Sequence, residues 1–324
     1  MNLDQFLLKN IQQYVSDLEI EALNIPIVDS INAVVNPNIN LDYVNDDIIK
    51  SLQNDGIYKF GNILDNKICD DILNYLSSKK VNTKNYKGIS SKVAKSKNEK
   101  FANYEEDVVY SNPIFHLIAN NPLILNTVTR YFGCLPTIQY MMCRWTYSFD
   151  NDKNPVRSQL FHHDYHGVKF LKLFIYLTDV NDINEAHVFV KGSHDNVKNE
   201  NCIKQYQKRN DCNQEVINDW YKKKKKRGEH KLKDNTIHEI FHKSKIDNVL
   251  GSKGFCFIED TNGMHKGNVP NQDRLFFSIT YTLYDSYKDA KPVKKYPNIL
   301  NLLNEEYKNT IELDQLKYIN RFIL

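Results

Sequence analysis

FLKLFIYL, residues 170–177, is the clearest strand signal in this chain. In a β-strand, side chains alternate between two faces, so Phe170, Lys172, Phe174 and Tyr176 share one face. The leucines and the isoleucine between them occupy the other. A run that is largely apolar on both faces, and rich in aromatic and branched side chains, predicts a strand inside a β core.

Similar runs continue on both sides of this stretch and are separated by Asn, Asp or Gly. The strands predicted after Pro136 are Thr137–Tyr147, Arg157–Asp164, Lys169–Leu177, His187–Val190, Gly254–Glu259 and Arg274–Tyr284. Before Pro136 the apolar spacing is mostly helical, with a helix expected from Pro122 to Gly133. The fold class predicted is mainly β with flanking helices, and its core is expected to be a sandwich or jelly roll.

Composition excludes several classes of protein. The chain of 324 residues has 43 basic and 40 acidic residues, so no strong overall charge attracts nucleic acid or a membrane surface. Its six cysteines show no CxxC pairing, which predicts a reducing, cytoplasmic location without a disulfide framework. No apolar run approaches the roughly 20 residues that a membrane-spanning helix needs.

Three regions are predicted along the chain. Residues 1–45 form a helical extension, residues 46–285 form the jelly-roll domain, and residues 286–324 form a helical tail. Within the domain, residues 195–248 lose the strand pattern and carry the basic run KKKKKR, residues 222–227, which predicts a solvated insertion outside the β core.

The chemistry is suggested by SQLFHHDYHG, residues 158–167. His162 and Asp164 are two residues apart on a predicted strand, so their side chains share a face. An imidazole beside a carboxylate provides two ligands of the facial triad that binds non-haem Fe(II). His265, in DTNGMHKG, is the candidate for the third ligand. Arg274 follows nine residues later and can pair with the far carboxylate of a chelating 2-oxo dicarboxylate.

At these residues the chain resembles the phytanoyl-CoA dioxygenase-like family of Fe(II)- and 2-oxoglutarate-dependent oxygenases. The resemblance covers roughly residues 46–285 and includes residues 48–76, residues 162–164, LFIYLTDVNDINEAHVFVKGSH and DTNGMHKG. It implies a double-stranded β-helix in which His162, Asp164 and His265 bind Fe(II) and catalyse the reaction, while Arg274 binds 2-oxoglutarate. NEAH and KGSH depart from the family pattern, but neither contains a predicted ligand.

The resemblance further implies hydroxylation of a small-molecule C–H bond by O2, with release of succinate and CO2. Asp164 argues against halogenation, because halogenating members replace this carboxylate with a small residue. AlkB-like nucleic-acid repair is disfavoured, because the second arginine of that group corresponds to Thr280. The alternative is a non-catalytic or zinc-binding jelly-roll protein. Neither the substrate nor the oligomeric state follows from the sequence.

Several residues keep two interpretations. Lys172 either faces the barrel lumen, where it would bind 2-oxoglutarate or the substrate, or faces solvent. A helical zinc pair of His162 and His166 is disfavoured by the strand-like context. The histidines flanking VFV and KGS, His187 and His194, are expected to make loop hydrogen bonds. Four residues stay open between structural and substrate-contacting roles: Gln139, Arg144, Tyr147 and Gln159.

Overall fold

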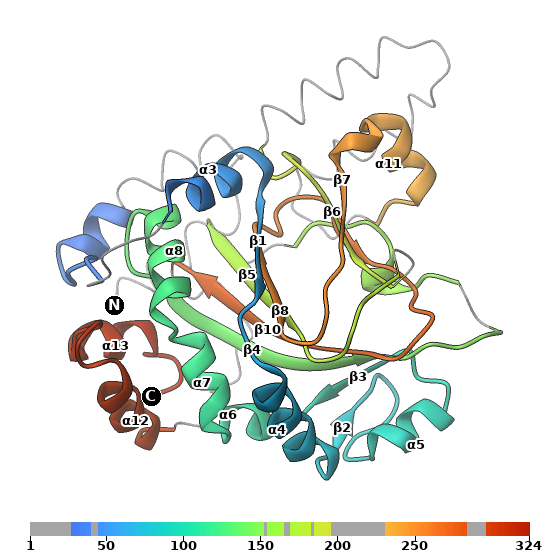
Figure 1. The fold of residues 1–324 in the computed structure, drawn as a ribbon, viewed down its shortest axis with the longest axis horizontal. Coiled ribbons are helices and arrows are strands. Elements are labelled where there is room, and N and C mark those ends of the chain that lie inside the picture. The colour runs from blue at the N-terminus through green and yellow to red at the C-terminus, as the bar shows by residue number, and fades with distance from the viewer. Residues whose placement is uncertain are drawn as a thin grey trace.

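Figure 1 shows the computed structural model of the protein. The structure describes residues 27–39, 45–151, 154–164, 169–182, 185–195, 231–283 and 296–324. The run at 222–227, His166, most of the N-terminal extension and most of the insertion lie outside these residues. The division of the chain into three regions therefore stays a prediction.

Two antiparallel sheets form the centre of the molecule. The larger sheet has the strand order β1-β8-β5-β10-β4-β3-β2, and the smaller has the order β7-β6-β9. The strands of the larger sheet are β1 (Ile57–Asn62), β2 (Val81–Asn82), β3 (Phe101–Tyr104), β4 (Thr137–Thr146), β5 (Phe170–Tyr176), β8 (Phe255–Glu259) and β10 (Arg274–Thr282). Those of the smaller sheet are β6 (His187–Val190), β7 (Ile246–Val249) and β9 (His265–Gly267).

The order in which the chain visits the sheets identifies the architecture. From β4 onward the chain passes to a bridge at residues 161–162 beside β9, back to β5, across to β6 and β7, and then through β8, β9 and β10. This alternation between facing antiparallel sheets is that of a jelly roll wound as a double-stranded β-helix. The predicted fold class, mainly β with flanking helices, is confirmed.

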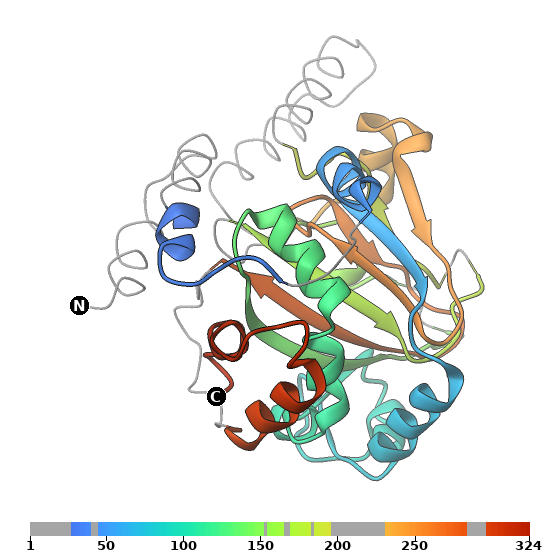
Figure 2. The ribbon, with the colours of Figure 1, turned by 60° about the vertical axis from the view of Figure 1, so that its left-hand side comes forward.

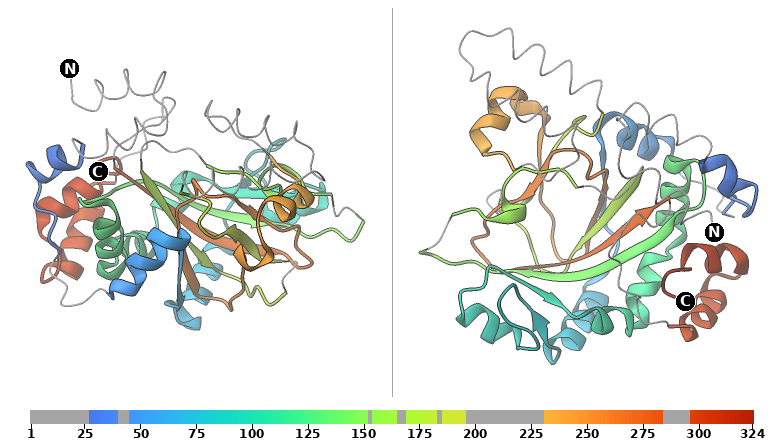
Figure 3. Two further views of the ribbon diagram at one scale, coloured as in Figure 1. Left: turned by 90° about the horizontal axis from the view of Figure 1, so that it is seen from above. Right: turned by 180° about the vertical axis from the view of Figure 1, so that it is seen from behind.

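The two faces of the larger sheet have different partners. On β10, Leu275, Phe277 and Ile279 are buried in the main apolar core, together with side chains from the helices. Arg274 and Phe276 alternate with them and therefore lie on the opposite face, toward the smaller sheet. Figures 2 and 3 show most of the helices gathered on one side of the large sheet, whereas the helix at Asp234–Ile240 lies beside the smaller sheet. Polar side chains can thus meet between the sheets.

The helices begin and end where local signals place them. Asn121 accepts hydrogen bonds from the backbone N–H groups of Leu123 and Ile124, and Gly133 ends the helix in the left-handed conformation at φ 83°. These are the expected N-cap and C-cap arrangements. The helices are α3 (Asp46–Asp55), α4 (Asn66–Ser77), α5 (Ser91–Ser96), α6 (Glu106–Tyr110), α7 (Pro113–Ala119), α8 (Pro122–Phe132), α11 (Asp234–Ile240), α12 (Asn298–Tyr307) and α13 (Leu313–Ile319).

Two sequence predictions are corrected by the structure. The strand expected at Arg157–Asp164 is instead a 3-10 turn, η1 (Arg157–Gln159), followed by bridges at Phe161 and His162. The insertion expected at 195–248 is not wholly outside the core, because its last residues form a 3-10 turn, η2 (Lys243–Lys245), and then β7. In both places short polar-rich segments acquire β pairing only from a neighbouring strand, which a local pattern does not reveal.

The C-terminal helices pack on the helical side of the large sheet. Buried Asn120, after α7, and Asn320, after α13, exchange side-chain amide hydrogen bonds of 3.1 and 2.7 Å. Cysteines 69, 134, 143 and 256 are buried and unpaired. Within the described residues, no helix is long and apolar enough to cross a membrane.

Helix α7 carries a buried histidine, His116, with one unpaired ring nitrogen among the described residues. The Nε2 atom of His116 lies 2.7 Å from the carbonyl oxygen of Tyr110 and donates to it, and its buried Nδ1 has no hydrogen-bond partner among the described residues. Burial lowers the pKa of His116, although the Tyr110 carbonyl opposes the shift. Protonation would place a second N–H in apolar surroundings with no acceptor.

We expect His116 to destabilise the protein in acid. Its pKa is lower in the folded state than in the unfolded state, so below about pH 6.5 the unfolded chain binds the additional proton. The shift in pKa therefore has no effect on the free energy of unfolding above that pH, and it lowers this free energy as the pH falls below it. Urea unfolding at pH 7.5 and 5.5 should show a smaller pH dependence in His116→Gln than in the native protein. An identical dependence would contradict this assignment.

Candidate metal centre

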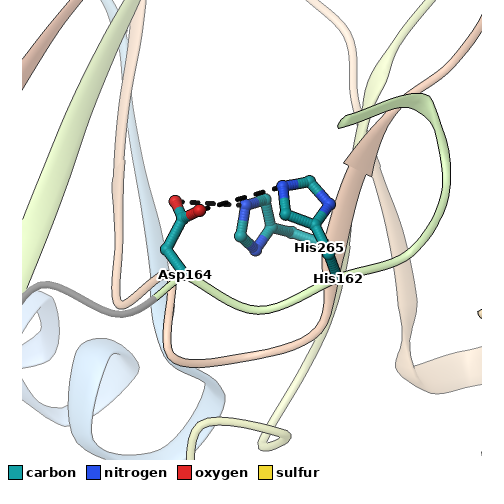
Figure 4. A group of neighbouring side chains, drawn as sticks. All are labelled: His162, Asp164 and His265. Atoms are coloured by element: carbon teal, nitrogen blue, oxygen red, sulfur yellow. Dashed lines mark ion pairs between the residues drawn. The ribbon is translucent and has the colours of Figure 1, made fainter. Parts of the chain in front are cut away.

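Backbone pairing places the two predicted histidine ligands directly opposite one another on neighbouring segments. His162 and His265 form an antiparallel bridge, with N···O distances of 2.9 and 2.8 Å in the two directions. The backbone N–H of Asp164 donates to the carbonyl of Thr261 at 2.8 Å, which brings the carboxylate alongside. Figure 4 shows the three side chains converging from these two segments.

The distances between the ligand atoms suit a single ion. Asp164 Oδ1 lies 3.8 Å from His162 Nε2, and Asp164 Oδ2 lies 3.5 Å from His265 Nε2. One ligand atom from each residue falls within 4.8 Å of the others. Among the described residues this is the one such group of three or more His, Cys, Asp or Glu side chains.

Each imidazole is oriented by a hydrogen bond from its other nitrogen. His162 Nδ1 donates to the carbonyl of Leu160 at 2.8 Å, and His265 Nδ1 donates to the carbonyl of Gly263 at 2.9 Å. Because a carbonyl oxygen only accepts, both Nδ1 atoms carry hydrogen and the Nε2 lone pairs remain for a ligand. Such hydrogen bonds commonly fix the tautomer of metal-binding histidines.

The electrostatics favour the metal-binding forms of two ligands. Burial opposes ionisation of Asp164, but the charge of Lys172 and the interaction with His265 hold its pKa well below the usual range. Burial and the neighbouring His265 lower the pKa of His162 to about 3, so its imidazole is neutral at neutral pH. An ionised carboxylate and a neutral imidazole are the forms that coordinate a cation.

The donor set fits a metal ion. Two imidazoles and one carboxylate form the facial set used by non-haem Fe(II) oxygenases, and this set leaves coordination positions open. The same donors also occur in catalytic zinc sites. The residues present are therefore compatible with Fe(II) and with the zinc alternative.

Lys172 faces the interior of the barrel. Its Nζ atom lies 2.5 Å from Asp164 Oδ2, and both side chains are 17% exposed. The solvent-facing interpretation of Lys172 is therefore wrong. The ammonium pairs with the carboxylate that is predicted to bind the metal, so the two buried charges balance one another.

Arg274 is a buried cation that has no carboxylate of the described residues within ion-pair distance, although the charge of Glu185 acts favourably on it. Its Nη1 donates to the backbone carbonyl of Glu185, and its buried Nε has no hydrogen-bond partner among those residues. Space for the guanidinium depends on Gly267, since a Cβ there would lie 2.7 Å from Arg274 Nη2. A buried charge without a counterion is unfavourable. The side chain is therefore suited to receive a ligand carboxylate.

A buried hydrogen-bonded pair of polar side chains lies beside the cluster and was not predicted. His187 Nε2 lies 2.9 and 3.0 Å from the two carboxylate oxygens of Glu259, whose side chain is fully buried. The His187 ring stacks on His265, with 5.7 Å between centroids, and also contacts Phe174. His187 thus lies in strand β6 within the barrel, and the expectation of a loop hydrogen bond is wrong. The sequence signal for this pair was a glutamate at the end of the otherwise apolar run FCFIE, since a carboxylate in such a run needs a buried partner.

The structure places the four residues that the sequence left between structural and substrate-contacting roles. Tyr147 is buried and its hydroxyl donates to the carbonyl of Ser91, so its role is structural. Gln159 accepts a hydrogen bond from the backbone N–H of Val156, within the turn before His162. Gln139 lies at an irregularity in the pairing of β4 with β10. Arg144 lies on the inner face of β4, while its neighbour Trp145 packs against the main core.

No protein-family model matches this chain, and no curated protein matches its sequence. HygX from Streptomyces hygroscopicus, with nickel and 2-oxoglutarate bound, is 11% identical over 78% of this chain and 91% of its own, with a TM-score of 0.48. The epimerase SnoN, in complex with Fe3+, alpha ketoglutarate and nogalamycin RO, is 14% identical over 73% and 82%, with a TM-score of 0.46.

EctD from S. alaskensis, with 2-oxoglutarate and 5-hydroxyectoine, is 12% identical over 76% of this chain and 81% of its own, with a TM-score of 0.45. At this level of similarity none of these proteins assigns an activity to the chain. The class of protein is defined by its own fold and site: a double-stranded β-helix that contains a cluster of two histidines and one carboxylate.

Proposed function

We propose that the protein is an Fe(II)- and 2-oxoglutarate-dependent dioxygenase that hydroxylates a C–H bond of a small molecule. The observation that carries the proposal is the cluster of His162, Asp164 and His265, whose ligand atoms lie within 4.8 Å of one another while each histidine Nδ1 donates to a backbone carbonyl. In this proposal these three residues hold Fe(II). Bound Fe(II), with 2-oxoglutarate and O2, supplies the oxidation and releases succinate and CO2.

The remaining side chains position the co-substrate. Arg274 binds the far carboxylate of 2-oxoglutarate through its guanidinium, because its buried Nε lacks an acceptor and no carboxylate of the described residues pairs with it. Lys172, whose ammonium lies beside Asp164, would bind a carboxylate of 2-oxoglutarate. The apolar side chains between the sheets exclude water from the reacting centre.

Anaerobic addition of Fe(II) and 2-oxoglutarate tests this function. We expect the weak visible charge-transfer band of the chelate to appear only when both are present, and succinate to form slowly when O2 is admitted. Succinate added in place of 2-oxoglutarate is the control, because it lacks the 2-oxo group that chelates. A folded protein that binds Zn(II) but gives no band with Fe(II) and 2-oxoglutarate would favour the zinc-binding alternative and reject the oxygenase.

A further inference from the structure

Arg144 is a cationic side chain between the sheets that has no role in the proposed function. Lys172 pairs with Asp164, and Arg274 is assigned to 2-oxoglutarate. Arg144 remains, on strand β4 opposite Phe276, which is two residues from Arg274 on the same face of β10. It therefore faces the space that contains the metal cluster. Its charge interacts favourably with that of Asp164, while burial lowers its pKa.

Local contacts hold the Arg144 guanidinium in place. Its Nε donates to Asn103 Oδ1 at 2.7 Å, and its Cζ lies 5.6 Å from the centroid of the Phe101 ring. Both partners come from the neighbouring strand β3. The two terminal nitrogens have no hydrogen-bond or ion-pair partner among the described residues. An immobilised guanidinium with both terminal nitrogens available suits a two-point contact with an oxyanion.

A second arginine adds positive charge near the first. Arg157, in turn η1, is exposed and has a φ of 51°, in the left-handed region that a branched or long side chain seldom adopts. Its charge acts unfavourably on that of Arg144. Backbone strain at a non-glycine residue often accompanies a functional site. Two cations that repel one another, one of them on a strained turn, favour the binding of an anion near them.

From these contacts we infer that the substrate of the proposed oxygenase carries a carboxylate or phosphate group, which Arg144 binds on the inner face of the large sheet. This inference rests on the proposed function, since it concerns the same site. Arg144 supplies the two-point contact, Asn103 orients it, and Arg157 adds attraction from the surface. Neutral molecules of the same shape would leave the guanidinium without a counterion and would bind more weakly.

Trifluoroacetate is a suitable probe for this anion site. The protein is loaded with Co(II) and saturating 2-oxoglutarate, which give a coordinated but unreactive centre, and 19F relaxation of trifluoroacetate is measured. Paramagnetic relaxation falls steeply with distance from Co(II), so it reports on anions near the centre rather than on surface lysines. Trifluoroethanol is the neutral control. We expect saturable relaxation with trifluoroacetate and little with trifluoroethanol.

Variants assign that signal to Arg144. In Arg144→Met the apparent affinity for trifluoroacetate should fall by at least about tenfold, as expected for a lost charge-assisted hydrogen-bonded contact. In Arg144→Lys, which keeps the charge but loses the two terminal nitrogens of the guanidinium, the apparent affinity for trifluoroacetate should fall less. Arg130→Gln removes a cation that pairs with Asp46 on the surface, and it should bind like the native protein. In each variant, the Co(II) spectrum with 2-oxoglutarate shows that the site is folded.

The outcomes separate this inference from the function on which it rests. Equal relaxation in the native protein and Arg144→Met, or none in either, overturns the anion site while leaving the oxygenase intact. A weaker affinity of Arg144→Met for 2-oxoglutarate would also overturn the anion site, because Arg144 would then bind the co-substrate and not a substrate anion. If the native protein does not bind Co(II) together with 2-oxoglutarate, both proposals fail.

Discussion

Replacing His265 with alanine should lower the affinity for Co(II) or Fe(II) by more than about 100-fold, because even residues that merely orient metal ligands contribute about 10–100-fold. The Nε2 atom of His265 is one of the three donors that converge, and its Nδ1 hydrogen bond to Gly263 fixes that orientation. No other described histidine has a ring nitrogen within the donor group. Isothermal titration under anaerobic conditions measures the change.

The matched control for this variant is His238→Ala. His238 is exposed on helix α11 and does not belong to the cluster, so its loss should leave metal affinity unchanged. Unfolding measured without metal should show that His265→Ala remains folded. Metal binding of native strength in folded His265→Ala would show that the cluster is not the metal site.

Replacing Arg274 with methionine should weaken 2-oxoglutarate binding by about 30-fold or more, since truncating one partner of a buried charge pair costs about 2–5 kcal/mol. The expected physical cause is the loss of the buried counterion for the far carboxylate of the co-substrate. Titration of the Fe(II) charge-transfer band with 2-oxoglutarate measures this affinity. Metal binding by Arg274→Met should stay close to that of the native protein, because Arg274 is not among the converging donors.

Gly267→Ala perturbs the same guanidinium without removing its charge. The added Cβ would lie 2.7 Å from Arg274 Nη2, so the guanidinium must shift and 2-oxoglutarate should bind more weakly, though less so than in Arg274→Met. Without 2-oxoglutarate, Arg274→Met should be at least as resistant to urea as the native protein, because an apolar group replaces a buried cation that no described carboxylate pairs with. An unchanged 2-oxoglutarate affinity in Arg274→Met would reject the assigned role.

The strands and caps could be predicted because their causes are local. Alternation in FLKLFIYL and in RLFFSITYTLY predicts β5 and β10, and Asn121 and Gly133 bound helix α8 within one residue. The face shared by Lys172, Phe174 and Tyr176 follows from the period of a strand alone. The strand predicted at Arg157–Asp164 was wrong because β pairing there is confined to isolated bridges, and the bridge at His162 depends on a partner more than 100 residues away.

Hydrophobic periodicity, helix caps and the HxD spacing act within a few residues, so the class of fold and the types of donor available follow from the sequence. Which side chains meet depends on the tertiary structure. Cross-strand register placed His265 against His162, turned Lys172 toward Asp164, joined His187 to Glu259 and set Arg144 on the inner face. The physical reason is that pairing register and sheet packing join residues distant in sequence, and local periodicity contains no information about these partners.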